Sequence, residues 1–249
     1  ETNRRIVDII SDVNMAYSEH ARRYLVDCGL PKERTYVTGS PMAEVLHNNL
    51  AEIEASDVHQ RLGLEKGKYI LLSAHREENI DTEKNFLSLF TAINKMAEKY
   101  DMPILYSCHP RSRNRLAASG FKLDPRVIQN EPLGFHDYNC LQMNAFAVVS
   151  DSGTLPEESS FFTSVGHPFP AICIRTSTER PEAIDKGDFI IAGIDEKSLL
   201  QAVDTAVELC QNCQHGIPVP DYADENVSTK VVKIIQSYVG IVNKMVWRK

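Results

Sequence analysis

The chain has 249 residues and a formal net charge of −7, and 43% of its residues are hydrophobic and 24% charged. This composition is typical of a globular, core-forming protein, longer than one ordinary domain and shorter than two full α/β domains. The negative charge and the lack of a Lys/Arg block argue against nucleic acid and membrane partners, and no apolar run approaches the roughly 20 residues of a membrane helix.

The first sixty residues predict the end of one α/β unit and a connection to the next. The chain has no signal peptide and no initiator Met, and it opens inside a predicted helix, so we expect a fragment of a longer protein. Ser18 is a candidate helix N-cap, and Gly29 is a stop signal. The predicted order is helix, strand, helix, strand and helix, at residues 1–10, 15–17, 18–28, 34–38 and 42–57.

From residue 69 onward, strands and helices alternate over about 150 residues. Asp81 is the expected N-cap of an amphipathic helix, and residues 136–143 and 199–210 predict two more helices. This alternation predicts an α/β fold, with a parallel sheet covered by helices on both faces. The expected strands are residues 69–73, 103–107, 127–128, 146–150, 171–174 and 189–191. Residues 214–223 predict a loop, and residues 226–244 a long amphipathic helix that needs a further surface to cover.

Cysteine usage predicts a reducing compartment, and we expect a cytoplasmic protein. Four of the six cysteines are isolated, mostly among apolar residues, where buried free thiols are common. The pair Cys210-x-x-Cys213, with His215 nearby, lacks a second pair at zinc-ligand spacing, so no metal site is predicted.

The turn at residues 150–154 is the first candidate binding site. An apolar strand ends there, and a helix begins with Pro156 in its first turn, so free N–H groups and the positive end of the helix dipole meet. Ser152 and Thr154 add hydroxyl donors for a phosphate, and Glu158 lies one helical turn further on, within reach of a ribose diol. The alternative is a capped helix that binds nothing.

Other polar clusters follow neighbouring strands. His75 and Arg76 come after the strand at 69–73, and residues 108–111 and 175–182 follow two others. A His and an Arg at such a place meet a phosphate or transfer a proton, or else shape a loop, with Arg76 paired to an acid. Because the carboxyl ends of parallel strands meet at one edge, these groups together indicate a nucleoside diphosphate site. The sequence has no P-loop, no Gly-x-Gly-x-x-Gly and no Gly-x-Ser-x-Gly motif.

A set of motifs along the chain resembles the non-hydrolysing UDP-N-acetylglucosamine 2-epimerase family. They are Glu1-x-Asn3-Arg4, Thr38-Gly39-Ser40, Ser-Ala-His-Arg-Glu-Glu-Asn at 73–79, Ser-Asp-Ser-Gly at 150–153, Glu157-Glu158 and Thr-Glu-Arg-Pro-Glu at 178–182. The form at 73–81 resembles most closely the capsule and O-antigen branch, which converts UDP-2-acetamido-2,6-dideoxy-L-talose into UDP-N-acetyl-L-fucosamine.

The resemblance implies a glycosyltransferase-B-like fold of two Rossmann-like domains with the active site between them. Residues 1–58 would end the N-terminal domain, most of which would be missing, and form the connecting helix. Residues 59–215 would form the C-terminal UDP-binding domain, and residues 216–249 a loop and a helix that crosses back. The family also implies a UDP-sugar substrate, no cofactor and a homodimer.

The resemblance also implies roles for single residues. Glu1 and His75 match catalytic residues, His75 near the diphosphate. Ser152, Gly153 and Thr154 match the phosphate-binding turn, in which the family more often has a second Gly at the position of Thr154. The remaining UDP-binding matches are Glu158 at the ribose, Tyr138 where the family has an aromatic residue by the uracil, Arg180 at the nucleotide or sugar, and Arg76.

The implied reaction inverts C2 of a UDP-N-acetylhexosamine by elimination and re-addition of UDP, for surface polysaccharide. The isolated 249-residue chain is expected to bind UDP weakly without turnover. One alternative is a UDP-N-acetylglucosamine 2-epimerase that gives UDP-N-acetylmannosamine. Others are a hydrolysing epimerase, a glycosyltransferase of the same fold, and a UDP-binding module without catalysis.

Overall fold

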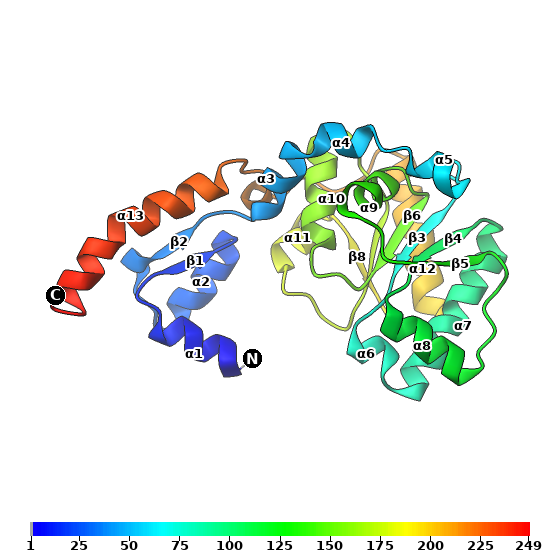
Figure 1. Cartoon of the computed structure of the whole chain (residues 1–249), viewed down its shortest axis with the longest axis horizontal. Helices are drawn as coiled ribbons and strands as arrows, with labels where there is room; N and C mark the ends of the chain where they lie inside the picture. Colours follow the sequence, from blue (N-terminus) through cyan, green and yellow to red (C-terminus); the bar gives the residue numbers. More distant parts are fainter. Residues whose placement is uncertain (1) are drawn as a thin grey trace. The chain divides into compact units, whose positions relative to one another are not determined.

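The computed structural model describes residues 2–249, which divide into two compact units. The first contains residues up to Asn48 together with Val219–Lys249, and the second is Asn49–Pro218. Figure 1 colours the chain from its N-terminus to its C-terminus. The assignment of residues 1–58, 59–215 and 216–249 to three parts stays a prediction.

The first unit is built on a two-stranded parallel sheet in which β1 (Asn14–Ala16) pairs with β2 (Thr35–Val37). Ser18 caps the following helix as expected, because its Oγ accepts a hydrogen bond from Ala21 N at 3.2 Å. The N–H of Ser40 donates to the carbonyl of Asp221 at 3.0 Å, which ties the end of the chain to this unit. Its helices are α1 (Thr2–Ile10), α2 (Glu19–Asp27), η1 (Lys32–Arg34), α3 (Pro41–Asn48), η2 (Pro220–Tyr222) and α13 (Val227–Met245).

The prediction of a single helix at residues 42–57 is wrong. The chain forms α3, breaks at Asn49 and continues as α4 (Leu50–Glu54) and α5 (Val58–Leu62). Asn49 has φ −114° and ψ 5°, a bridge conformation that Asn adopts readily, and its Oδ1 lies 2.9 Å from Nε2 of His136. A polar side chain bonded outside the helix therefore ends it, which the apolar pattern did not indicate.

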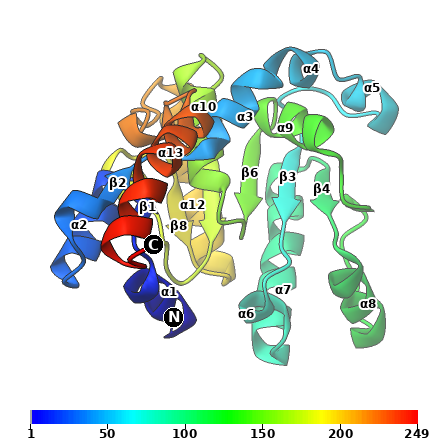
Figure 2. The same cartoon turned by 60° about the vertical axis from the view of Figure 1, so that its left-hand side comes forward.

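The second unit contains a six-stranded parallel sheet, so the α/β prediction is confirmed. The strand order is β5-β4-β3-β6-β7-β8, in which the chain first builds outward from β3 and then returns to place β6 on the other side of β3. Figure 2 shows β3 between β4 and β6. This is the order of dinucleotide-binding folds, with its switch point between β3 and β6. The strands are β3 (Ile70–Ser73), β4 (Ile104–Ser107), β5 (Val127–Asn130), β6 (Ala147–Ser150), β7 (Ala171–Ile174) and β8 (Ile190–Ala192).

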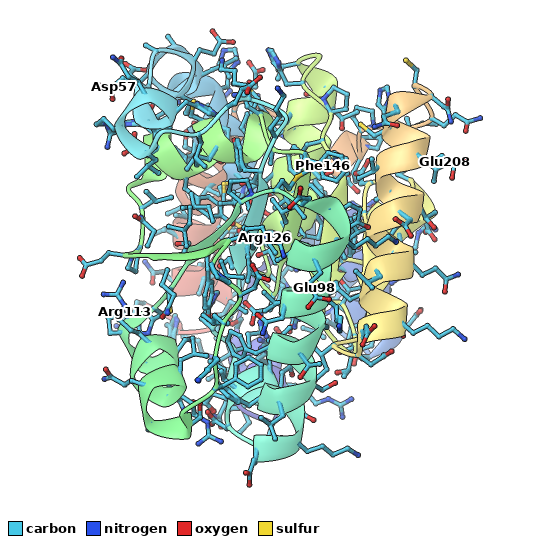
Figure 3. All side chains as sticks on the ribbon, turned by 90° about the vertical axis from the view of Figure 1, so that its right-hand side faces the viewer. Asp57, Glu98, Arg113, Arg126, Phe146 and Glu208 are labelled. Carbon is cyan, nitrogen blue, oxygen red and sulfur yellow. The ribbon has the colours of Figure 1, made fainter. Side chains whose placement is uncertain are left out.

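Helices cover both faces of this sheet. On one face, α7 (Glu83–Tyr100) and α12 (Glu196–Gln211) lie side by side, with Glu98 and Glu208 exposed on their outer sides (Figure 3). Successive strand residues such as Leu71 and Leu72 point to opposite faces, and both are fully buried. The other helices of this unit are α6 (Glu77–Ile80), α8 (Pro110–Ser119), α9 (Phe135–Met143), α10 (Leu155–Ser164) and α11 (Pro181–Asp185).

The expected N-cap of α7 is corrected by one residue. Thr82 occupies that place and accepts a hydrogen bond from Asn85 N at 3.3 Å. Asp81 instead accepts from Nη2 of Arg111, at 2.9 Å and 2.8 Å to its two oxygens. Over residues 2–249, no helix combines the length and the apolar character needed to cross a membrane.

Candidate functional site

The polar residues predicted from the sequence gather at the switch point of the second unit. Ser73 at the end of β3 lies beside Ser150 at the end of β6 in the parallel ladder. The loops that follow these two strands carry His75 and Arg76 on one side and residues 151–154 on the other. Ligands of open parallel sheets bind outside the carboxyl ends of the strands at such a point.

Asp151, which is fully buried, organises the two loops. Its Oδ2 accepts hydrogen bonds from the backbone N–H of His75 at 2.9 Å and of Arg76 at 2.8 Å, and from Nδ2 of Asn79 at 3.1 Å. Its Oδ1 lies 3.1 Å from Nδ1 of His75 but accepts no well-aligned hydrogen bond from residues 2–249. Asp151 therefore fixes the backbone before α6 and lies against the imidazole of His75.

The loop after β3 is held from two further directions. Asn79 also donates to the carbonyl of Ile174 at the end of β7, at 3.0 Å. The carbonyl of Ala74 accepts from the hydroxyls of Tyr106 at 2.7 Å and Ser112 at 3.2 Å. Buried side chains from β4, α6 and α8 thus fix the backbone on both sides of His75, whose side chain remains 47% exposed.

Two guanidinium groups face Gly153. A Cβ atom on Gly153 would lie 3.5 Å from Nη2 of Arg76 and 4.0 Å from Nη1 of Arg175. Arg76 is oriented by a hydrogen bond from its Nε to the carbonyl of Asp151 at 2.8 Å. Arginine presents fixed N–H donors that suit phosphate, so this face of the turn favours an anion.

Arg175 is a buried cation, only 8% exposed. Its guanidinium lies 3.9 Å from a carboxylate oxygen of Glu78 and 3.6 Å from one of Glu179, and its Nε has no hydrogen-bond partner within residues 2–249. A buried charge with so little compensation is costly unless an anion completes its environment. Arg175 is therefore a candidate phosphate ligand.

The turn from Ser152 to Thr154 leads into the N-terminus of α10. Thr154 is the N-cap residue, and its hydroxyl donates to Oε1 of Glu158 at 2.7 Å. The hydroxyls of Ser152 and Thr154 lie 2.9 Å apart and share a hydrogen bond. The first N–H groups of a helix lack intrahelical partners, so this end of α10 attracts negative charge.

Glu158 lies one turn into α10 and is only 8% exposed. Besides Thr154, its carboxylate accepts from Nε2 of Gln142 on α9 at 2.8 Å. Burial raises the pKa of the Glu158 carboxyl above its ordinary value, and the hydrogen bonds from Thr154 and Gln142 oppose this shift. The carboxylate thus has fixed donors on both oxygens and retains lone pairs for a ligand.

Tyr138 and Arg180 complete the predicted set within the described residues. Tyr138 on α9 has its pKa raised above the ordinary value by burial and by the nearby charge of Glu158, so its hydroxyl stays protonated. Arg180 precedes α11, and its Nε donates to Oε1 of the buried Glu157 at 2.7 Å. Glu1 lies outside the described residues. The roles assigned to all these residues stay predictions.

Sequence reasoning did not select three residues of this site, Asp151, Asn79 and Gln142, and it included Arg175 only as the first residue of the polar cluster at 175–182. Arg175 follows β7 directly, and its place at a strand end is what put it in that cluster, as it did for His75 and Ser152. Asp151 and Asn79 lie inside the quoted motifs, but their buried contacts depend on three strand ends meeting. Gln142 gives no sequence signal, because only the packing of α9 against α10 brings it to Glu158.

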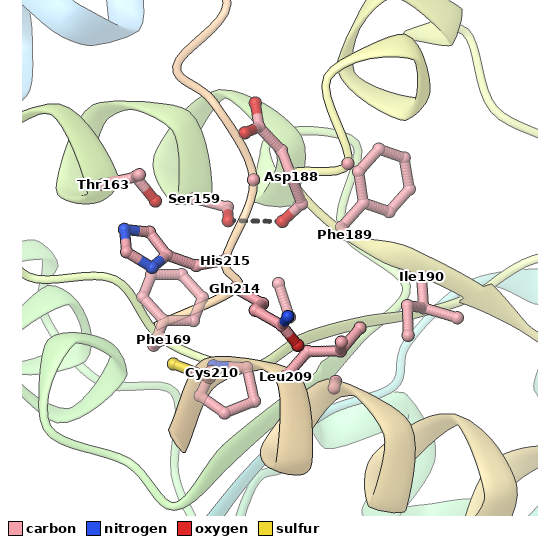
Figure 4. Close-up of a pocket in the computed structure, with 15 residues that line it drawn as sticks. Ser159, Thr163, Phe169, Asp188, Phe189, Ile190, Leu209, Cys210, Gln214 and His215 are labelled. Atoms are coloured by element: carbon pink, nitrogen blue, oxygen red, sulfur yellow. Dashed lines mark hydrogen bonds between the residues drawn. The ribbon is translucent and has the colours of Figure 1, made fainter. Parts of the chain in front are cut away.

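A separate cavity of about 50 Å³ lies near the amino ends of β7 and β8 (Figure 4). Its lining includes Phe169, Asp188, Ile190, Cys210 and His215. Because the site described above lies at the carboxyl ends of the strands, this cavity is no part of it. In the part of the chain that the structure describes, no cluster of His, Cys, Asp or Glu has a metal-binding arrangement.

Comparison with known proteins shows which family the chain belongs to. A protein-family profile described as UDP-N-acetylglucosamine 2-epimerase matches residues 1–236. The chain belongs to the UDP-N-acetylglucosamine 2-epimerase family. Within this family, the UDP-N-acetylglucosamine 2-epimerase of Methanococcus maripaludis is 31% identical over 211 residues, which cover 82% of this chain and 56% of that protein. The family predicted from the motifs is confirmed.

Solved structures of the family have the same fold. The UDP-N-acetylglucosamine 2-epimerase from Rickettsia bellii matches with a TM-score of 0.89 and 39% identity, covering 100% of this chain and 65% of that chain. The Methanocaldococcus jannaschii enzyme, in complex with UDP-GlcNAc and UDP, matches with a TM-score of 0.83 and 26% identity, covering 95% of this chain and 64% of that chain. This chain therefore spans less than two thirds of the length of these family members.

Proposed function

We propose that this protein is a UDP-sugar 2-epimerase and that its second unit holds the UDP. The observation that carries the proposal is the face of Gly153, where Arg76, Arg175 and the N-terminus of α10 converge. Two cations and a helix N-terminus match the charge of a diphosphate. Membership of the epimerase family, and a family member solved with UDP-GlcNAc and UDP, support a uridine nucleotide.

The nucleoside end of the ligand fits the neighbouring residues. Glu158 offers a buried carboxylate that accepts hydrogen bonds, which is the complement of a ribose diol. Tyr138, from the adjacent α9, supplies an aromatic ring for the base. Arg180 is a weaker candidate ligand, since its Nε is already bonded to Glu157.

The proposed reaction proceeds by elimination and re-addition. A base removes the proton at C2, its electron pair forms the C1–C2 double bond, and the C1–O bond breaks with its pair leaving on UDP. A phosphate oxygen of UDP then re-adds to C1 while a proton returns to the opposite face of C2. Arg76 and Arg175 are proposed to stabilise UDP as it leaves, and His75, which follows the same strand as Arg76, is proposed to transfer a proton.

Two substrates are proposed in order. The motif Ser-Ala-His-Arg-Glu-Glu-Asn-Ile-Asp at 73–81 favours UDP-2-acetamido-2,6-dideoxy-L-talose, giving UDP-N-acetyl-L-fucosamine for capsule or O-antigen. The names of the relatives favour UDP-N-acetylglucosamine instead. An assay of the complete enzyme with both UDP-sugars separates the two, because only the true substrate changes configuration at C2.

The remaining acid and base groups are proposed to lie in Glu1 and in a further segment, since this chain spans less than two thirds of its relatives. The complete enzyme is proposed to be a cytoplasmic homodimer. The 249-residue chain is then expected to bind UDP weakly in calorimetry without exchanging the C2 proton in D2O. Exchange of that proton by this chain alone would contradict the division of roles, and a lack of UDP binding would contradict the function itself.

A further inference from the structure

The buried amide of Gln142 has a single polar contact among the described residues. Gln142 is fully buried on α9, its Nε2 donates to Oε2 of Glu158 at 2.8 Å, and its Oε1 has no hydrogen-bond partner within residues 2–249. A buried acceptor without a donor costs free energy that an apolar side chain of the same size would avoid. The fold therefore gains little from this amide, apart from its bond to Glu158.

The bond restricts the carboxylate of Glu158. Thr154 donates to Oε1 and Gln142 to Oε2, so the carboxylate is held from two different helices and cannot turn without losing a hydrogen bond. Hydrogen bonds to a charged acceptor are among the stronger ones in proteins. Without Gln142, the carboxylate would retain only the donor from its own helix, and its orientation would be less restricted.

We infer that Gln142 is a positioning residue, which orients Glu158 to accept hydrogen bonds from the 2′- and 3′-hydroxyls of a bound ribonucleotide. The inference rests on the proposed function, since it takes UDP as the ligand. It adds a specificity element on α9, the helix that also carries Tyr138 one turn earlier, at spacing i and i+4. A single helix thus presents an aromatic ring to the base and holds the carboxylate that accepts from the ribose.

The test compares UDP with 2′,3′-dideoxy-UDP in titration calorimetry of the 249-residue chain. Wild type is expected to bind UDP about tenfold more tightly than 2′,3′-dideoxy-UDP, because only UDP offers ribose hydroxyls to Glu158. Gln142→Met keeps the length of the side chain but has no donor, and it is expected to weaken UDP binding while leaving dideoxy-UDP binding unchanged. Gln201→Leu, at an exposed position of α12, is the matched control and is expected to retain the wild-type preference.

A double-mutant comparison separates positioning from a merely structural role. Glu158→Leu is expected to abolish the preference for UDP, and Gln142→Met added to it should then change the preference no further. The inference is overturned if Gln142→Met weakens the binding of both nucleotides equally, or if it leaves both affinities unchanged. If wild type binds neither nucleotide, the proposed function fails, and if it binds both equally, only the role of Glu158 and Gln142 fails.

Discussion

Gly153 lies where the two arginines of the candidate site come closest to the backbone. We expect Gly153→Ala to be tolerated by the fold, because its methyl group would make ordinary contacts at 3.5 Å and 4.0 Å. The methyl would nevertheless cover guanidinium N–H groups of Arg76 and Arg175 that a phosphate needs, so UDP affinity should fall about tenfold in calorimetry. Gly134→Ala, where an added Cβ meets nothing within 4 Å, is the control. Equal UDP affinity of both variants and wild type would remove Gly153 from the site.

Asp188 is a buried carboxyl whose two oxygens have no hydrogen-bond partner among residues 2–249. Burial raises its pKa to about 7, which nearby Ser160 and Lys186 only partly oppose. The folded state therefore binds this proton more tightly than the unfolded state does, and the free energy of unfolding should fall as the pH rises from about 4 to about 7.

Asp188→Asn removes this titration. Its stability relative to wild type should increase between pH 5 and pH 8 by up to about 3 kcal/mol, measured by urea unfolding at both values. Asp185→Asn, at an exposed position of α11, is the control and should follow wild type. If the free energy of unfolding of Asp188→Asn differs from that of wild type by the same amount at both pH values, the carboxyl of Asp188 stays in one protonation state.

Asn79 connects three elements, and its loss should loosen the loop that carries His75. Asn79→Ala removes hydrogen bonds to Asp151 and to the carbonyl of Ile174, so we expect a cost of roughly 1–3 kcal/mol in urea unfolding. UDP affinity should fall as well, because Arg76 lies in the same loop as His75. Asn85→Ala, which removes an exposed bond to the carbonyl of Glu78, should cost less than about 0.5 kcal/mol. A similar cost for both would argue against a connecting role for Asn79.

At the scale of elements, the sequence predicted those with a strong local pattern. β3, β6 and β7 are short, apolar and buried, and α7 and α12 have long apolar stripes, so each was found. α6 and α11 were not predicted, because four or five residues are too few to show a helical period. The break at Asn49 was missed because it depends on a bond to His136, which is distant in sequence.

At the scale of the molecule, the alternation of strands and helices predicts a parallel sheet but not the order of its strands. The chain places β6 beside β3 rather than beside β5, and this return creates the switch point. The sequence showed each of the strand ends that precede His75, Ser152 and Arg175. Their gathering at one edge of the sheet was expected from the sequence. The approach of Arg76 and Arg175 to Gly153, and the buried contacts of Asp151 and Gln142, depend on strand order and helix packing and could not be predicted.

The two units differ in how far they are internally stabilised, and this predicts different local stability. In the first unit, β1 and β2 have three residues each, and none of the described residues of α1 or α2 is buried. Apolar side chains such as Ile9, Ile10 and Trp247 are 75%, 73% and 61% exposed. Two-stranded sheets are marginal alone, and parallel sheets are normally covered on both faces.

We therefore expect backbone amides of β1 and β2 to exchange with D2O at least about a hundredfold faster than those of β3 and β6, which are central strands whose residues, apart from the partly buried Ser73, are buried. Hydrogen-exchange mass spectrometry of the 249-residue chain measures both in one sample, so the second unit is the internal control. If β1 and β2 exchange as slowly as β3, a further surface covers the first unit, and the chain is then expected to sediment as an oligomer. If they exchange fast and a separately added N-terminal segment of a relative slows them, that segment is able to cover the first unit.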